Sequence, residues 1–217
     1  MSPASATSPV VGFDLDMTLV DSAAGIAATL QAALAELGRG VTREEMWPHV
    51  GVPLEAALAV VAPDVDAVAV TRRYRELYAE HGIPPITLLP GAREALAAVH
   101  ALGGRVLVVS AKAEPAVRRV LAHVGLDRPP HAPDLVAGGR FAGAKGELLR
   151  RERADVYVGD HPGDIEAARV GGAVAVGVAT GPFTSPQLLA EGADVVLADL
   201  RGLPAWLHDR FGAELSA

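Results

Sequence analysis

The chain has 217 residues, 50% of them hydrophobic, so one sizeable core can form with room for an inserted subdomain. Its formal net charge is −7 and it contains no basic run, which argues against a nucleic acid or an anionic membrane as partner. It contains no cysteine, so disulfides and thiolate chemistry are excluded, and a structural zinc site is not expected.

The N-terminal residues 1–9 are Ser, Ala, Thr and Pro around the initiator Met, without the basic and apolar regions of a signal peptide. We expect a frayed tail there. No apolar stretch reaches the roughly eighteen residues that a membrane span needs. The prediction is a soluble, cytoplasmic protein.

The stretch from Val10 to Ser22 organises the chain. Val10 to Phe13 predict a short buried strand, which runs into two carboxylates, Asp14 and Asp16. Two residues apart in an extended segment, these side chains lie on the same side. Buried acids need a partner, and Mg²⁺ suits a site built from carboxylates and a phosphate. A helix-capping role suits Asp21 and Ser22 better, because they directly precede a helical pattern.

Residues 23–85 are predicted to form three or four helices without a strand. Apolar residues recur at three- and four-residue spacing in this block, and a capping-box pattern begins at Thr42. The expected helices span 23–37, 42–50, 54–61 and 64–80. Gly82 to Pro85 break the last one.

From residue 86 onward, strand and helix patterns alternate. The expected strands are 105–110, 134–137, 155–158, 173–178 and 194–197, and helical patterns lie between them. Such alternation implies an α/β fold with a Rossmann-like parallel sheet and helices on both faces. The helical block is too long for a simple crossover. We therefore predict a core of residues 1–22 and 86–217 and an inserted helical cap of residues 23–85.

Polar side chains follow three of the predicted strands. In open parallel sheets, ligands bind beyond the carboxyl ends of the strands. The residues at this edge supply acids for a metal, a hydroxyl and ammonium groups. They are Asp14, Asp16 and Thr18 after the first strand, Ser110 and Lys112 after the second, Asp160 and Asp164 after the fourth, and Lys145 at the start of the preceding helix.

These residues resemble, in order, the four motifs of the haloacid dehalogenase superfamily, in the branch with a helical cap inserted after the first strand. Asp14-Leu15-Asp16-Met17-Thr18 matches the first motif, Ser110 the second, Lys145 the third and Gly159 to Asp164 the fourth. The resemblance covers residues 10–200. Within the family, the segments 19–22, 89–92 and 110–112 are similar to phosphoglycolate phosphatase-like members.

The resemblance implies a role for each of these residues, and each role is chemically sensible. Asp14 is then the nucleophile and Asp16 the general acid and base. Mg²⁺ is expected between Asp14, the Asp16 carbonyl and Asp160. The resemblance further implies that Ser110, the Ala111 amide and Lys145 bind the phosphate. Asp164 is expected to orient a water molecule or Lys145, and Thr18 to support the loop.

The predicted function is a Mg²⁺-dependent phosphatase acting on a small phosphorylated metabolite, as a monomer or homodimer. A phosphomutase with the same core is the main alternative. A hydrolytic dehalogenase is disfavoured because it needs no leaving-group acid such as Asp16. A phospho-receiver module would lack the insertion 23–85, and intact motifs argue against a non-catalytic binding protein.

Three further residues near the motifs are not expected to take part in catalysis. Met17 stands where many relatives have glycine, and a positive φ would strain it. We expect instead that the site accepts an apolar side chain. Lys112 is kept outside the catalytic set as a solvated helix-start residue, although the chain has only two lysines. His161 is expected to pack or bond to its loop.

In the cap, Arg72, Arg73 and Arg75 are expected on a solvated helix face. The six histidines other than His161 are expected at the surface or at helix ends. Trp47 and the turn 51–53 are candidates for lining the inner face of the cap and selecting the substrate.

Overall fold

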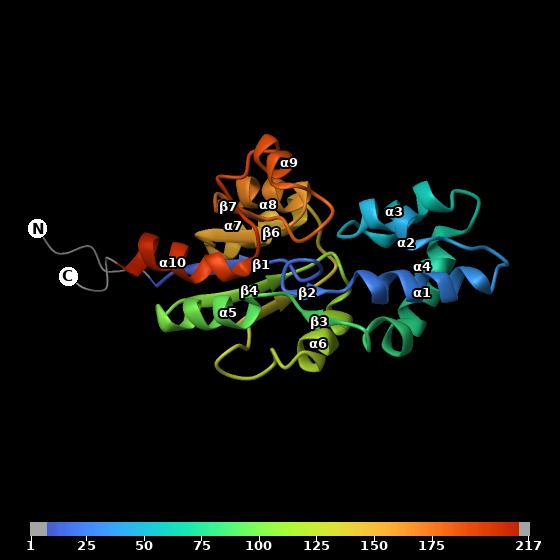
Figure 1. The fold of residues 1–217 in the computed structure, drawn as a ribbon, viewed down its shortest axis with the longest axis horizontal. Coiled ribbons are helices and arrows are strands. Elements are labelled where there is room, and N and C mark those ends of the chain that lie inside the picture. The colour runs from blue at the N-terminus through green and yellow to red at the C-terminus, as the bar shows by residue number, and fades with distance from the viewer. Residues whose placement is uncertain (1–7, 213–217) are drawn as a thin grey trace, which may run out of the picture.

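A six-stranded parallel sheet forms the centre of the molecule (Figure 1), seen in a computed structural model that describes residues 8–212. The strand order is β5-β4-β1-β6-β7-β8. The strands are β1 (Val10–Phe13), β4 (Arg105–Val109), β5 (Leu135–Ala137), β6 (Val156–Gly159), β7 (Val174–Val178) and β8 (Val195–Leu197). The prediction of an α/β parallel sheet is therefore confirmed.

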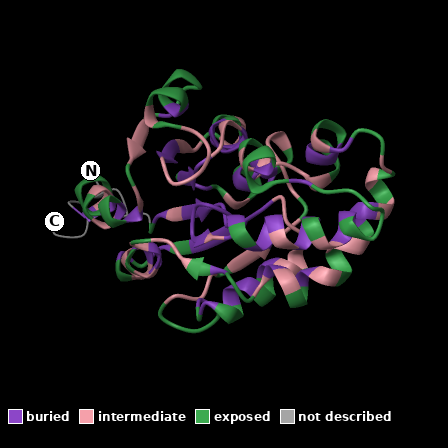
Figure 2. Ribbon diagram, turned by 45° about the vertical axis from the view of Figure 1, so that its right-hand side comes forward, coloured by how far each residue is buried: buried purple, intermediate pink, exposed green. Residues whose placement is uncertain are grey.

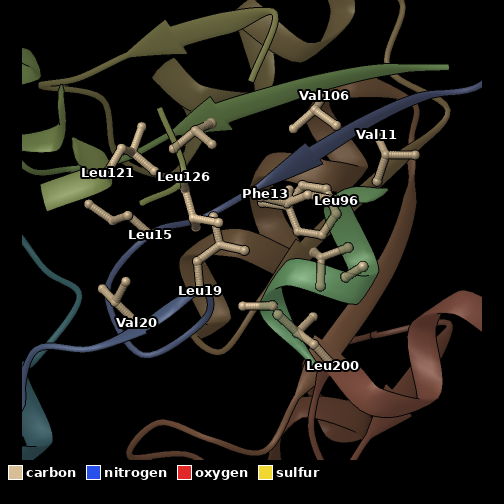
Figure 3. Packing of buried hydrophobic residues seen from close by; sticks show 14 of the residues in the cluster. Val11, Phe13, Leu15, Leu19, Val20, Leu96, Val106, Leu121, Leu126 and Leu200 are labelled. Atoms are coloured by element: carbon tan, nitrogen blue, oxygen red, sulfur yellow. The ribbon is translucent and has the colours of Figure 1, made fainter. Parts of the chain in front are cut away.

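Both faces of this sheet are buried, as the β-branched runs of the strands predict. In β4, Val106 and Val108 face one apolar cluster, whereas Leu107 and Val109 face another. Figure 3 shows the first cluster, where Phe13 of β1 packs beside Leu96. Its helices are α5 (Ala92–Ala101), α6 (Glu114–His123) and α10 (Leu203–Phe211), and those of the opposite face are α7 (Gly143–Glu152), α8 (Pro162–Gly171) and α9 (Ser185–Ala190).

A second group of helices lies beyond one end of the sheet (Figure 1). It has its own apolar cluster, which includes Leu30, Leu34, Leu58 and Val70. Its elements are α1 (Ala23–Ala35), α2 (Arg43–Met46), the 3₁₀ turn Trp47–His49, α3 (Leu54–Val61), α4 (Ala67–Leu77) and a π-helical turn, η2 (Tyr78–Gly82). We call these helices the cap, and its division from the core at residues 22 and 86 stays a prediction.

A short ribbon marks the place where the chain leaves the core and returns to it. β2 (Val20–Asp21) pairs antiparallel with β3 (Thr87–Leu88). Sequence patterns did not predict these strands, because two residues carry no periodicity. Next to this ribbon, α1 and η2 pack closely against each other. A Cβ atom added to Gly25 would lie only 2.0 Å from the Gly82 carbonyl oxygen, so only glycine fits there.

Several predicted helix ends differ from the observed ones. Asp21 Oδ1 accepts a hydrogen bond of 3.2 Å from the Ala23 amide, whereas the Ser22 hydroxyl does not cap α1. The helix expected from residue 64 begins at Ala67, because Asp66 caps it through the amides of Val68 and Ala69. The short turn Leu200–Gly202 and α10 follow the last predicted strand and were not anticipated.

Burial follows the same division into layers. Figure 2 shows buried residues along the strands and exposed residues on the outer faces of the helices. Among residues 8–212, no helix combines the length and the hydrophobicity that crossing a bilayer requires.

Candidate active site

The carboxyl end of β1 delivers the first motif into a tight loop. The Asp14 amide donates to the Val158 carbonyl over 2.9 Å, which extends the pairing of β1 with β6. The Leu15 carbonyl then accepts hydrogen bonds from the amides of residues 18, 19 and 20. Asp14 and Asp16 are 3% and 6% exposed, so both carboxylates are held in a largely dry site.

Met17 adopts the left-handed conformation, with φ = 58°. The expectation that its position needs no positive φ is wrong. Its side chain is nevertheless buried, and it packs in the apolar cluster of the cap. Thr180 donates a hydrogen bond of 2.5 Å to the Met17 carbonyl, which holds the turn in place. The apolar side chain is thus accepted together with the unfavourable backbone.

Lys145 joins two of the predicted acids. It lies in the first turn of α7 and is 1% exposed. Its ammonium donates to Asp14 Oδ1 over 2.9 Å and to Asp164 Oδ1 over 2.7 Å. The ammonium therefore neutralises part of the charge that β1 and α8 bring together.

The fourth motif turns from β6 into α8. Asp164 closes a capping box, and its Oδ2 accepts a hydrogen bond of 3.2 Å from the His161 amide. His161 Nδ1 accepts one of 2.9 Å from the Gly163 amide, so His161 bonds to its own loop as predicted. Thr18 donates to Asp160 Oδ1 over 2.7 Å, which ties the first motif to the fourth.

Asp14, Asp160 and Asp164 form an acidic cluster, in which one oxygen from each lies within 4.8 Å of the others. Burial raises the pKa of Asp14 to about 7, against the lowering effect of Lys145. Burial also raises the pKa of Asp160 well above its usual value, and neighbouring Asp164 and Asp14 add to this. Three buried acids so close together favour a bound cation, which would lower these pKa values.

A test of fit supports a divalent cation at this cluster. Asp160 Oδ2 is buried and has no hydrogen-bond partner among residues 8–212. A Cβ on Gly181 would lie 1.8 Å from that oxygen, so the loop after β7 closes over it without supplying a donor. An oxygen in this position is a natural Mg²⁺ ligand. The Asp16 side chain is not in this cluster, and metal binding by its carbonyl stays a prediction.

The Asp16 side chain is paired with Lys112. Lys112 Nζ lies 3.2 Å from Asp16 Oδ2 and 4.4 Å from the centre of the Tyr78 ring. Burial lowers the pKa of Lys112, but Asp16 and the two tyrosines, Tyr74 and Tyr78, outweigh it and keep the amine charged. The interpretation of Lys112 as a solvated residue is wrong. The rarity of lysine in this chain was the one signal that pointed to it.

Ser110 and Ala111 lie at the end of β4, beside the first motif. The Ser110 amide pairs with the Ala137 carbonyl over 3.0 Å, and its Oγ accepts a hydrogen bond of 3.2 Å from the Lys112 amide. Ser110 is 1% exposed. Both residues line a cavity of about 300 Å³, together with Asp14, Asp16 and Lys112.

The cap lines the other side of this cavity. The turn 51–53 takes part, as expected. Trp47 is not among the lining residues but packs against the apolar cluster of the cap, so its expected place is wrong. His49 lies at the end of the 3₁₀ turn and Arg75 is exposed, as expected, but both also line the cavity. Their places depend on how the cap folds over the core, which local patterns do not encode.

Comparisons with known proteins agree with this architecture. The family model described as haloacid dehalogenase-like hydrolase matches residues 11–130. A haloacid dehalogenase-like hydrolase from Streptococcus pneumoniae superposes with a TM-score of 0.80 at 21% identity, over 92% of this chain and 98% of that one.

Two curated relatives are each 32% identical. The phosphoglycolate phosphatase of Pectobacterium atrosepticum aligns over 86% of this chain and 87% of its own length. The tyrosine-protein kinase PtkA of Mycobacterium tuberculosis aligns over 75% of this chain, which spans only 59% of PtkA. The family match over residues 11–130, together with the 32% identity to a full-length relative, shows that this chain belongs to the haloacid dehalogenase-like hydrolase family.

Proposed function

We propose that the chain is a Mg²⁺-dependent phosphatase that hydrolyses a small phosphomonoester of the phosphoglycolate type through an aspartyl-phosphate on Asp14. One observation carries the proposal. Asp14 belongs both to the acidic cluster and to the wall of the cavity. It is the residue at which a bound cation and a bound substrate would meet.

In the first step, an Asp14 oxygen attacks the phosphorus atom and the ester P–O bond breaks. Asp16 gives its proton to the leaving alcohol oxygen. Asp16 Oδ1 is buried, finds no hydrogen-bond partner in the part of the chain that the structure describes, and belongs to a residue that lines the cavity, which supports this role. Lys145 holds Asp14 in place through its hydrogen bond of 2.9 Å.

In the second step, water attacks the phosphorus atom of the aspartyl-phosphate and Asp16 takes up the proton of that water. Phosphate leaves and the Asp14 carboxylate is restored. Asp14, Asp160 and the Asp16 carbonyl would hold Mg²⁺, which would supply charge neutralisation between the carboxylate and the phosphoryl oxygens. Asp164 orients Lys145 through a hydrogen bond of 2.7 Å.

The phosphoryl group is expected beside Ser110, the Ala111 amide and Lys145. Ser110 Oγ accepts from the Lys112 amide, so its own hydroxyl hydrogen is free to turn toward a phosphoryl oxygen. We propose that residues 23–85 act as a cap that closes over the cavity and excludes bulk water. The phosphoglycolate phosphatase relative supports a small organic leaving group.

The test is a panel of phosphomonoesters, assayed for phosphate release with and without Mg²⁺. Asp14→Asn should lower kcat by at least about 10⁴-fold while the protein stays folded by circular dichroism. Asp66→Asn is the matched control, since Asn caps α4 as well as Asp does, and it should retain full activity. Persistent activity in Asp14→Asn would exclude Asp14 as the nucleophile.

The same assay separates hydrolysis from transfer. A phosphomutase would return the phosphoryl group to the sugar without releasing phosphate. A chain that labels itself but does not turn over would act as a receiver module. Transfer to tyrosine in a peptide, which the name of the PtkA relative suggests, would show as labelled peptide instead of free phosphate.

A further inference from the structure

One stripe of side chains on the cap faces the reacting groups. Thr71, Tyr74 and Tyr78 follow one another at spacings of three and four residues along α4 and into η2, so they share one face. All three line the cavity together with Asp16 and Lys112. The Tyr78 ring packs under the Lys112 ammonium, at 4.4 Å from its centre. This stripe therefore borders the side of the cavity where the leaving alcohol departs.

Two hydroxyl groups on this stripe are poorly satisfied within residues 8–212. Thr71 and Tyr78 are 3% and 4% exposed, Thr71 Oγ1 makes no hydrogen bond in that range, and the Tyr78 hydroxyl has only a weak contact with the Lys112 ammonium that falls short of hydrogen-bond geometry. A buried hydroxyl without a partner destabilises the folded state. Both groups belong to residues of the cavity wall, so a bound ligand is the partner that would satisfy them.

Most of the remaining cap side is apolar, although His49, Glu55 and Arg75 also line the cavity. The hydrocarbon and thioether side chains there are Ile26, Met46, Val50, Val52, Leu54 and Ala57. A leaving group as polar as glycolate would cover none of this surface. An alcohol that carries a hydrocarbon substituent would bury it and gain from the hydrophobic effect.

We propose, on the basis of the proposed function, that this enzyme prefers phosphate esters of 2-hydroxy acids that carry a hydrocarbon side chain. The carboxylate lies one carbon from the ester oxygen that Asp16 protonates, which brings it next to Lys112. The hydroxyls of Thr71 and Tyr78 donate hydrogen bonds to this carboxylate. The hydrocarbon substituent packs against the apolar side chains of the cap.

The first test varies only the substituent. The phosphate esters of glycolate, lactate, 2-hydroxybutyrate and phenyllactate share the phosphoryl and carboxylate groups and differ in hydrocarbon. We expect kcat/KM to rise from the first to the last, by roughly fourfold for each methylene that the cavity buries. A flat or falling series would overturn the hydrocarbon part of the proposal.

The second test removes the two hydroxyls. The quantity measured is the ratio of kcat/KM for phospholactate to that for isopropyl phosphate, which lacks the carboxylate. Thr71→Val and Tyr78→Phe should each lower this ratio by roughly 10- to 100-fold, mainly through KM. Thr29→Val is the matched control: Thr29 is a buried threonine of α1 that bonds to the Gly25 carbonyl, and it should keep the ratio.

Thermal unfolding distinguishes ligand binding from a structural role. Because Thr71 Oγ1 has no hydrogen-bond partner among residues 8–212, Thr71→Val should leave Tm unchanged or raise it. Tyr78→Phe gives up only the weak contact with Lys112 and should lower Tm by less than Tyr157→Phe does. Tyr157→Phe removes a hydroxyl that donates to the Val109 carbonyl over 2.8 Å, and should lower Tm by about 2–4 °C. A loss of Tm in Thr71→Val or Tyr78→Phe with an unchanged ratio would mean that the hydroxyls serve the fold.

Failure of this inference differs from failure of the proposed function. If no phosphomonoester is hydrolysed, or if Asp14→Asn stays active, the proposed function itself fails. Suppose instead that the esters are hydrolysed and Asp14→Asn is inactive. If the ratio of kcat/KM for phospholactate to that for isopropyl phosphate then stays at the wild-type value in both Thr71→Val and Tyr78→Phe, only the assignment of these two residues is wrong.

Discussion

Lys112 and Asp16 form an ion pair inside the wall of the cavity, with the ammonium 3.2 Å from Oδ2. The other lysine of the chain, Lys145, contacts Asp14 over 2.9 Å. Each of the two lysines thus holds one carboxylate of the first motif, and the two acids are oriented separately. Asp14 is held towards the acidic cluster, and Asp16 is held beneath the aromatic residues of the cap.

This pairing makes Lys112 a positioning residue for the proposed general acid. Lys112→Met keeps most of the side-chain volume and removes the charge, so Asp16 loses its orientation. We expect kcat for an alkyl phosphate to fall by roughly 10²-fold. For p-nitrophenyl phosphate the loss should be much smaller, because nitrophenolate leaves without a proton.

The comparison of the two substrates is the control for this variant. Equal losses with both substrates would mean that Lys112 only stabilises the fold or binds phosphate. Thermal unfolding should accompany the kinetics, because loss of one partner of a buried ion pair destabilises a protein by about 3–5 kcal/mol.

Much of the core could be predicted from local patterns. β1 and β4 are apolar runs that end in Asp14 and Ser110, and parallel strands bring such ends to one edge of a sheet. The acids of the cluster followed from that rule, and the structure does bring Asp14, Asp160 and Asp164 together. Local sequence was sufficient there because Asp14 and Asp160 directly follow strand ends and Asp164 lies in the first turn of the helix that comes next.

The features that were missed depend on contacts between distant segments. Lys112 was interpreted as solvated, yet a tyrosine 34 positions earlier in the chain covers its ammonium. Arg75 resembles any other arginine on a polar helix face until the cap folds over the core. The positive φ of Met17 depends on a turn that Thr180 stabilises from the other half of the chain.

The acidic cluster predicts how metal and pH affect stability. Burial raises the pKa of Asp14 from 3.8 to about 7 in the metal-free protein. The folded state then binds more protons than the unfolded state between about pH 4 and pH 7, so the free energy of unfolding should fall as the pH rises through that window.

Mg²⁺ should reverse this loss, because it binds the ionised carboxylates. We expect the rise in Tm on adding Mg²⁺ to be small at pH 5 and larger at pH 8, as measured by differential scanning fluorimetry. Asp14→Asn should weaken the pH dependence of the metal-free protein. A shift that is the same at both pH values would contradict a cation at this cluster.

Two arginines at the cavity predict an effect on substrate capture. Arg75 and Arg119 line the cavity, and neither makes an ion pair within residues 8–212. In a chain of net charge −7 they offer a local positive field to an anionic substrate. Substitution of both by Gln should raise KM several-fold and weaken its dependence on salt, with little change in kcat.

Arg118→Gln is the matched control for that pair. Arg118 lies next to Arg119 on α6, but it contacts Glu114 and does not line the cavity. Its substitution should leave KM and the salt dependence unchanged. An equal rise of KM in this variant would point to the overall charge of the protein instead of the cavity.

At Met17, two contributions to the free energy of unfolding oppose each other. A non-glycine residue at φ = 58° is destabilised by about 1–2 kcal/mol. Its buried side chain gains about 1.5–3 kcal/mol from packing in the cap cluster. Met17→Gly relieves the strain but loses the packing and adds flexibility to the unfolded chain, so we expect a net loss of stability of about 1 kcal/mol.

Urea unfolding measures this balance, and Met17→Ala separates its two parts. Alanine keeps the strain and loses most of the packing, so it should be less stable than both glycine and methionine at this position. A glycine variant more stable than the wild type would mean that the backbone strain outweighs the contact with the cap. In that case Met17 would be retained for a reason other than stability.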